Sequence, residues 1–292
     1  MVIVKIIGGL GNQMFQYACG KALSTERSLP LLLDVSDFKS YTRHNGFELE
    51  NVFGIKDQFA DEDFLFEKFG LRGLSPLRKF LKNKFLRYVA HPRIVYEDPS
   101  RFNELSNTTG SPIWLVGHWQ SEAYFRRINS IIINDFTFRT VVRDDINELL
   151  TKIDSSVSVS MHIRRGDYLS DRKTRSILHS LDMGYYARAM DYFDSALKHC
   201  RYFIFSDDLD WVRDRFPKSK EAILVALNRG RESFIDMWLM SRCKHHVIAN
   251  STFSWWGAWL GGFNSKIVIA PRKWYLKESN YLSPIPQGWV KL

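Results

Sequence analysis

Two adjacent arginines that follow a predicted buried strand are the residues of this sequence most suited to chemistry. They lie in His162-Ile-Arg-Arg-Gly-Asp-Tyr168, directly after a strand predicted from Val157. Two guanidinium groups at such a place are costly unless they meet an anion, and their planar fork matches phosphate oxygens. Side chains alternate along a strand, so we expect one arginine to face a ligand and the other to hold Asp167 or the backbone. The structural alternative is an Arg–Asp ion pair that closes the loop.

Polar residues also follow two other predicted strands. Asp207 and Asp208 come after a strand that ends at Phe205. A carboxylate there can accept two hydrogen bonds from the N1 and N2 groups of guanine, or it can cap the following helix, and the two roles can coexist on adjacent aspartates. Asn250-Ser-Thr-Phe-Ser254 offers hydroxyl and backbone donors at a predicted helix start. These donors suit either a diphosphate or helix capping.

A glycine-rich segment, Gly8-Gly-Leu-Gly-Asn-Gln-Met14, joins the first predicted strand to the first predicted helix. It lacks the third glycine of a dinucleotide-binding loop, because Met14 stands there, and it lacks the lysine of a P-loop. On these residues alone we favour a tight strand-to-helix turn. The functional alternative is a loop of backbone N–H groups at a helix N-terminus, suited to a polar or anionic ligand.

The predicted strands and helices alternate in two series. The first contains strand Val2–Ile7, helix Asn12–Leu23 and strands Leu29–Asp34 and Ile113–Val116. After a helix at Asp144–Lys152, the second contains strands Val157–Ile163, Tyr202–Phe205, Val247–Ala249 and Ile267–Ala270 and helices Tyr185–Cys200, Ser233–Cys243 and Trp255–Leu260. This alternation predicts an α/β protein that binds ligands at the carboxyl ends of its strands. We expect two domains, residues 1–150 and 151–292.

The composition narrows the function classes. A hydrophobic fraction of 45% and a charged fraction of 25% exclude a disordered, collagen-like or coiled-coil chain. Lysine and arginine number 41 against 32 acidic residues, and the net charge of +9 favours an anionic partner. Nucleic-acid binding is disfavoured, because the charge is spread along the chain without a helix-turn-helix, zinc or RNP pattern.

The three cysteines are too few and too scattered for a disulfide framework, which indicates a reducing compartment. Cys243 lies near His245 and His246, but no second ligand pair accompanies them, so we expect a buried thiol and no zinc site. Met1–Ile7 lacks the basic region and cleavage site of a signal peptide, and no apolar stretch approaches the roughly 18–20 residues of a membrane span. We expect a cytoplasmic protein.

Pro76–Ala90 is predicted to be an amphipathic helix rich in lysine and arginine. One interpretation is a helix that packs on its own domain and exposes a basic face. The other is peripheral attachment to the anionic inner leaflet of a membrane, where each basic residue contributes about 1 kcal/mol. We favour the first.

Three segments together resemble a known family. Gly8-Gly-Leu-Gly-Asn-Gln-Met-Phe-Gln-Tyr-Ala18, His162-Ile-Arg-Arg-Gly-Asp-Tyr168 and Ala249-Asn-Ser-Thr-Phe-Ser-Trp-Trp256 are similar to motifs of the α-1,2-fucosyltransferases of glycosyltransferase family 11. The likeness runs from residue 3 to about residue 275. The His-x-Arg-Arg core is also similar to α-1,6- and protein O-fucosyltransferases, so it indicates GDP-fucose more than linkage.

The resemblance implies a GT-B-like architecture of two Rossmann-like domains facing a cleft, with the acceptor on the N-terminal side and GDP-fucose on the C-terminal side. It implies an inverting transfer of fucose from GDP-β-L-fucose to the 2-hydroxyl of a β-galactoside or related glycan, in surface glycan or O-antigen synthesis, without a metal or other cofactor. The alternatives are a fucosyltransferase of other linkage and a non-catalytic nucleotide- or carbohydrate-binding protein of the same fold.

By the same resemblance, Arg165 neutralises the β-phosphate of the departing GDP with support from Arg164. Asp167 is the first choice for the general base, although it could only buttress the arginines; Asp171 and a base in the N-terminal domain are further candidates. His162 and one of the two aspartates are implied to contact the guanosine. The full set of expected substrate contacts is Gly9, Gly11, Asn12, Gln13, His162, Arg164, Ser206, Asp207, Asp208, Asn250, Ser251, Thr252, Phe253 and Ser254.

Overall fold

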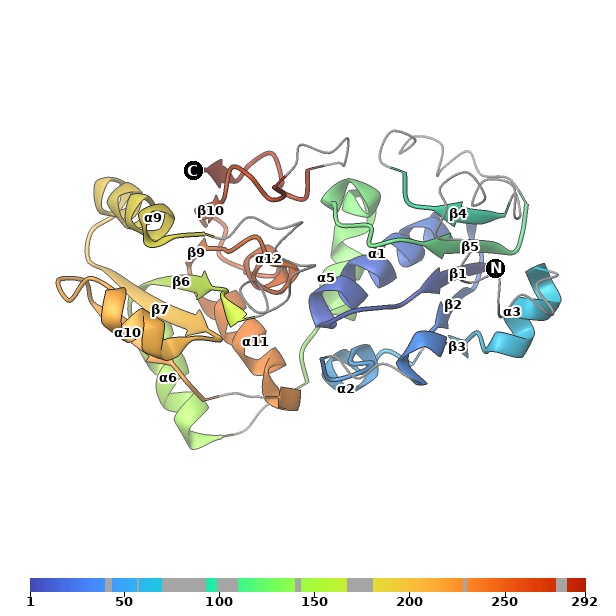
Figure 1. Cartoon of the computed structure of the whole chain (residues 1–292), viewed down its shortest axis with the longest axis horizontal. Coiled ribbons are helices and arrows are strands. Elements are labelled where there is room, and N and C mark those ends of the chain that lie inside the picture. The colour runs from blue at the N-terminus through green and yellow to red at the C-terminus, as the bar shows by residue number, and fades with distance from the viewer. Residues whose placement is uncertain are drawn as a thin grey trace. The chain divides into compact units, whose positions relative to one another are not determined.

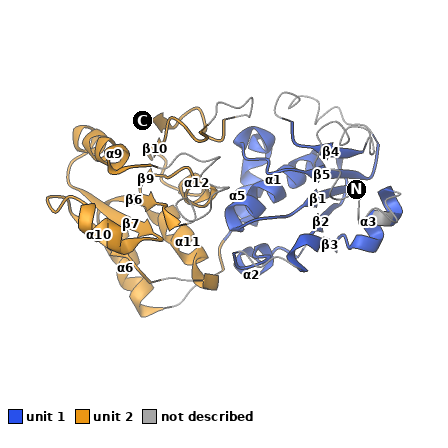
Figure 2. Cartoon of the chain, in the orientation of Figure 1, with its two compact units in different colours: residues 1–137, 280–282 blue, residues 138–279, 283–292 orange. Residues whose placement is uncertain are grey.

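The chain forms two compact α/β units, each built around a parallel sheet (Figures 1 and 2). Unit 1 spans Met1–Thr137, and unit 2 spans Phe138–Ser279 together with Ser283–Leu292. The computed structural model describes residues 1–39, 44–56, 58–69, 93–98, 110–139, 143–166, 181–227, 230–276 and 283–292. The basic segment 76–90 lies outside the described residues, so both interpretations of it stay predictions.

The sheet of unit 1 has the strand order β3-β2-β1-β5-β4, and every pairing is parallel. The first three residues of the central strand β1 are buried on both faces, which explains the apolar run Val2-Ile-Val4 before Lys5. The strands are β1 (Val2–Lys5), β2 (Leu31–Asp34), β3 (Gln58–Phe59), β4 (Ile94–Tyr96) and β5 (Ile113–Val116). The α-helices described in this unit are α1 (Leu10–Arg27), α2 (Leu49–Phe53), α3 (Glu62–Phe69) and α5 (Asn129–Asp135).

Helix α1 packs unusually close to β1 and β2. A Cβ atom at Gly20 would lie 2.9 Å from Cγ1 of Val4 and 3.0 Å from Cδ1 of Leu31, so a larger residue would push the helix off the sheet. In dinucleotide-binding loops the third glycine serves this close packing of helix and strand. Here Gly20 serves it, although Met14 occupies the position where the loop motif expects glycine.

The sheet of unit 2 has the order β11-β10-β9-β6-β7-β8, again with every pairing parallel. The chain enters at the centre in β6, moves outward through β7 and β8, and then returns to β9 on the other side of β6. This is the strand order of the Rossmann fold, and the connections diverge between β6 and β9. The strands are β6 (Val157–Ile163), β7 (Cys200–Ser206), β8 (Ala222–Val225), β9 (His245–Val247), β10 (Val268–Ala270) and β11 (Val290–Lys291).

Helices cover both faces of this sheet, and alternate residues of β6 face each side. Val159, Met161 and Ile163 pack with helix α9 (Met183–Ala196) in one apolar cluster. A second cluster joins helices α6 (Asp144–Asp154) and α11 (Phe234–Arg242) to side chains of β7 and β8. The other α-helices described in this unit are α10 (Leu209–Arg215) and α12 (Thr252–Trp259).

The structure corrects the end of one predicted helix and the expected boundary between the two domains. The predicted helix Tyr185–Cys200 ends at Ala196, because Leu197 has extended backbone angles and Cys200 already begins β7. The expected domain boundary at residue 150 falls inside α6, whose Ile146 and Leu149 are buried in unit 2, so the units divide earlier, after Thr137. Among the described residues, no helix combines the length and apolar character needed to cross a membrane.

Three histidines of unit 2 are buried, His162, His245 and His246, and burial lowers the pKa of each. His246 is fully buried, and its Nδ1 lies 2.9 Å from the Ser160 hydroxyl. Burial, followed by the charge of Lys266, lowers the pKa of His246 well below its usual range. His162 is 5% exposed, and burial followed by the charge of Arg164 lowers its pKa to about 3. The imidazoles of His162 and His246 are therefore neutral in the folded chain at neutral pH.

The free energy of unfolding should therefore fall as the pH drops below about 6.5, since the unfolded chain takes up protons that the folded chain refuses. Each buried histidine whose pKa is lowered contributes up to about 1.4 kcal/mol per pH unit below that point. Urea unfolding between about pH 7.5 and pH 5 measures this slope. His246→Asn should reduce the slope, and His118→Gln, which changes an exposed histidine, should not. A constant free energy across the range would contradict the buried neutral state.

Candidate functional site

The carboxyl edge of the unit 2 sheet collects the three segments that the sequence singled out. β6 lies between β7 and β9, and Ile163 of β6 pairs with Ser206 of β7. Residues 164–166, 207–208 and 250–254 follow the ends of these three strands. Because the chain connections diverge between β6 and β9, this is where an open α/β sheet binds ligands.

The guanidinium group of Arg165 is held from two sides. Its Nε donates a hydrogen bond to Oδ2 of Asp208 at 3.1 Å, and its Cζ lies 3.9 Å from the centre of the Trp211 ring. The ion pair and the stacking together fix the plane of the guanidinium group. Within the described part of the chain, no acceptor bonds to its two Nη groups. They are therefore free to bind an anion.

Asp208 can hold Arg165 because Asp208 is itself fixed. Its Oδ1 accepts a hydrogen bond from the Trp211 amide at 3.1 Å as the N-cap of α10, and its own amide donates to the Ser206 hydroxyl at 3.0 Å. The capping alternative is thus confirmed for Asp208. The sequence analysis missed Trp211, although its place three residues after a helix cap puts both residues on one side of the first turn.

Asp207 ties down the turn that carries the arginines. Its two carboxylate oxygens accept hydrogen bonds from the amides of Arg165 at 2.9 Å and Gly166 at 3.0 Å, and Nη1 of Arg164 lies 3.0 Å from Oδ2. A Cβ atom at Gly166 would lie 2.8 Å from Oδ2 of Asp207, so the turn needs glycine there. Asp207 and Asp208 therefore position the two arginines, and both carboxylates already have protein partners without a guanine.

The side chains of His162 and Phe253 lie near each other on the face of β6 opposite the one that packs against α9. Their ring centres lie 5.9 Å apart, and Nδ1 of His162 is buried without a hydrogen-bond partner in the described part of the chain. The backbone of His162 is held as well, because the Tyr186 hydroxyl donates to its carbonyl oxygen at 3.2 Å. A buried nitrogen without a hydrogen bond lowers the stability of the fold, and a hydrogen bond donated by a bound ligand would remove this penalty.

The expected binding segment around α12 divides into structural and accessible residues. Asn250 is buried and donates from Nδ2 to the Trp274 carbonyl oxygen at 3.1 Å, and buried Ser254 donates to the Ser251 carbonyl oxygen at 3.3 Å. These two side chains shape the turn. Ser251, Thr252 and Phe253 are half-buried at the start of α12, where unbonded backbone N–H groups suit a phosphate.

Gln13, in the glycine-rich loop of unit 1, has a structural role instead of the expected substrate contact. Its side chain is fully buried. Nε2 donates to the carbonyl oxygens of Gly8 at 2.9 Å and Gly46 at 2.8 Å, while Oε1 accepts from the Glu48 amide at 2.9 Å. Gln13 therefore fastens residues 46–48 to the loop and keeps no donor for a substrate.

The other expected residues of this loop differ in accessibility. Gly11 is buried within the first turn of α1, while Gly9 and Asn12 are half-buried. Oδ1 of Asn12 accepts a hydrogen bond from Nε2 of Gln120, which follows β5, at 2.7 Å. Gly9 and Asn12 follow the carboxyl end of β1, beside β5, which is the edge where parallel α/β sheets bind ligands.

The general base is not located by this geometry. Asp167 and Asp171 lie outside the described residues, so their roles stay predictions. Within the described stretches, no group of three or more His, Cys, Asp and Glu side chains is arranged to hold a metal ion. The described polar groups of the site, the arginines and the N–H groups at the start of α12, suit an anion.

Full-length relatives of the chain are glycosyltransferases. It is 35% identical to an α-1,2-colitosyltransferase of Escherichia coli, over 100% of this chain and 99% of that protein. It is 31% identical to the O-antigen biosynthesis glycosyltransferase WbnK of Escherichia coli, over 98% of each. A bovine galactoside 2-α-L-fucosyltransferase, SEC1, is 28% identical over 55% of this chain and 45% of that protein.

The fold has solved counterparts. The crystal structure of the fucosyltransferase NodZ from Bradyrhizobium superposes with a TM-score of 0.52 at 17% identity, over 88% of this chain and 91% of that chain. This likeness confirms the expected α/β architecture of GT-B type. A sequence model of glycosyl transferase family 11 matches residues 1–291. The chain belongs to glycosyl transferase family 11.

Proposed function

We propose that the protein transfers L-fucose from GDP-β-L-fucose to the 2-hydroxyl of a galactose-type sugar, with inversion at the anomeric carbon, during O-antigen synthesis. The observation that carries this proposal is the fixed Arg165 guanidinium group at the Rossmann crossover of a family 11 chain. The α-1,2 linkage is supported by the colitosyltransferase and by the bovine galactoside relative, and the O-antigen assignment by WbnK.

In this proposal the acceptor oxygen attacks the anomeric carbon while the bond from that carbon to the β-phosphate oxygen breaks. Negative charge then builds up on GDP, and the two Nη groups of Arg165 stabilise it. Because Asp208 and Trp211 already fix the guanidinium plane, little reorganisation is needed as the charge develops. The proton of the acceptor hydroxyl passes to a general base, for which Asp167 stays our candidate.

The remaining residues of this edge hold the nucleotide. Ser251, Thr252 and the first amides of α12 suit the diphosphate. The half-buried ring of Phe253 contacts the guanine base, and Nδ1 of neutral His162 accepts a hydrogen bond from the base. Arg164 contributes positive charge nearby while it pairs with Asp207.

A second donor is favoured by one specific comparison, the 35% identity to an α-1,2-colitosyltransferase over the whole chain. Colitose is fucose without its 3-hydroxyl, so the same nucleotide contacts serve both donors. Purified protein should be offered GDP-fucose and GDP-colitose separately with a β-galactoside, and GDP release and product linkage should be measured. An α-1,2-fucosyl product formed with the higher kcat/KM supports the first proposal. Transfer of colitose alone would replace it with the second, and neither product would contradict both.

Arg165→Ala should lower turnover by about 10²–10³-fold or more, the usual scale for removing one fixed charge stabiliser. Arg165→Lys should recover only part of the loss, because an ammonium group cannot reproduce the fork or the stacking on Trp211. Arg213→Ala is the matched control, since Arg213 lies on the same short helix with 55% of its side chain exposed. A folded Arg165→Ala protein with the turnover of this control would contradict the role of Arg165.

Catalysis should not depend on a metal ion. Asp208 and Asp210 have the alternating spacing that can hold a divalent cation, but Asp208 is bonded to Arg165 and caps α10, while the Asp210 side chain is 91% exposed and pairs with Arg213. Binding a cation there would break the contact that fixes Arg165. We therefore expect full activity in excess EDTA. A loss of activity that Mn²⁺ or Mg²⁺ restores would overturn this prediction.

A further inference from the structure

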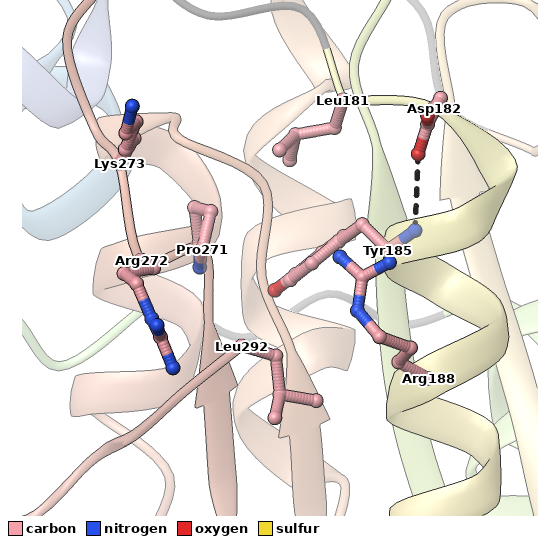
Figure 3. A pocket seen from close by; sticks show the side chains of 8 residues that line it. All are labelled: Leu181, Asp182, Tyr185, Arg188, Pro271, Arg272, Lys273 and Leu292. Atoms are coloured by element: carbon pink, nitrogen blue, oxygen red, sulfur yellow. Dashed lines mark hydrogen bonds between the residues drawn. The ribbon is translucent and has the colours of Figure 1, made fainter.

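A second concave site lies in unit 2, between the start of α9 and the segment that follows β10 (Figure 3). Its volume is about 530 Å³, within the range of roughly 300–1,000 Å³ that small-molecule sites occupy. None of its lining residues belongs to the set expected or described above for the nucleotide. Nothing in the proposed transfer reaction requires it.

The pocket has an excess of positive charge. Arg188 comes from α9 on one side, and Arg272 and Lys273 come from the segment after β10 on the other (Figure 3). In the described part of the chain, no carboxylate lies within ion-pair distance of these three groups. The one acidic side chain of the lining, Asp182, accepts a hydrogen bond from the Tyr185 amide as the N-cap of α9. The main-chain oxygen of Leu292, also in the lining, accepts a hydrogen bond from the Arg272 amide at 2.7 Å. The three cations outnumber the acidic groups of the lining, so the pocket attracts an anion.

The floor of the pocket is rigid and largely apolar. Tyr185 is 2% exposed, and its hydroxyl donates a hydrogen bond to the Ile248 carbonyl oxygen at 2.7 Å. The Ile269 carbonyl oxygen lies 3.3 Å from the same hydroxyl. The Tyr185 hydroxyl therefore links the chain at the ends of β9 and β10 beneath the pocket. Leu181 and Pro271 are buried beside it. Arg188, Arg272 and Lys273 are exposed at the rim, so the phosphate oxygens would meet the cations there while an organic group could lie on the apolar floor.

The pocket and the guanosine-binding residues lie on opposite faces of the sheet. Tyr185 belongs to the apolar cluster that covers the α9 face, together with alternate residues of β6. His162, whose ring meets Phe253 of α12, occupies the alternate position on β6 and so points to the other face. A nucleotide bound against Phe253 thus leaves the floor of the pocket uncovered.

We propose that this pocket binds the phosphate or diphosphate group of a small phosphate ester, at a site separate from the nucleotide site. The cations at the rim hold the phosphate oxygens, and the apolar floor receives the organic part. The proposal does not rest on the identity of the sugar donor.

Calorimetric titration with inorganic pyrophosphate and with glycerol phosphate, in the presence of GDP to fill the nucleotide site, tests the proposal, and glycerol serves as the uncharged control ligand. Both anions should bind, and glycerol should not. Arg272→Glu/Lys273→Glu should weaken pyrophosphate binding by about tenfold or more, since it removes two charge-assisted contacts and adds repulsion. Arg188→Gln should weaken it through the opposite wall of the pocket. Arg213→Glu/Lys218→Glu makes the same charge change at exposed positions of unit 2 and should leave the affinity unchanged.

Two further measurements separate this site from the nucleotide site. With the nucleotide site filled by GDP, pyrophosphate should still bind, and Arg165→Ala should leave this second binding event unchanged. Failure of the sugar-transfer proposal would not alter this result. The inference is overturned if pyrophosphate does not bind while GDP is present, or if the pocket variant then binds as well as the charge-matched control.

Discussion

The candidate site depends on one interaction, the contact of the Arg165 guanidinium group with the Asp208 carboxylate and the Trp211 ring. An arginine side chain has considerable rotamer freedom, and an unrestrained one would lose much of its binding energy in becoming ordered. Here the Nε contact and the ring fix the plane while the Nη groups stay available. A single short helix supplies both partners, so the geometry of α10 sets the geometry of the arginine.

The sheet topology makes this contact possible. β6 and β7 are parallel neighbours, so the turn after one strand lies beside the turn after the other. Asp207 then bonds to the amides of Arg165 and Gly166, which fixes the backbone that carries the arginine. Backbone and side chain of Arg165 are thus held by two successive aspartates. Such an arrangement stabilises a developing charge without first having to assemble.

The sequence predicted which edge of the sheet carries the candidate site better than it predicted the role of each residue there. Strand ends followed by arginines, aspartates and hydroxyl residues identified the carboxyl edge of unit 2, since parallel strands bring their carboxyl ends together. The roles of Asp207 and Gln13 could not be predicted, because a carboxylate or amide that binds substrate has the same local sequence as one that binds backbone. Only the tertiary partners, such as the amides of Gly166 and Glu48, separate the two cases.

Other features escaped prediction for related reasons. Trp211 lies in a helix too short to show a periodic pattern, so its spacing from Asp208 was the one sequence signal for its contact with Arg165. The two-residue strands β3 and β11 are shorter than any pattern can signal. The fold class was predictable because the central strands β1 and β6 are long or apolar enough to be recognised in the sequence. The alternation of strands with helices then indicates a parallel, Rossmann-like sheet.

A crystal structure of the protein with GDP bound would test the role of Arg165 most directly. We expect the β-phosphate within hydrogen-bond distance of the Nη groups of Arg165, with Nε still bonded to Asp208 and the guanidinium group still stacked on Trp211. The α-phosphate should then lie at the first turn of α12. GDP bound elsewhere, or bound here with Arg165 turned away from the β-phosphate, would contradict this role.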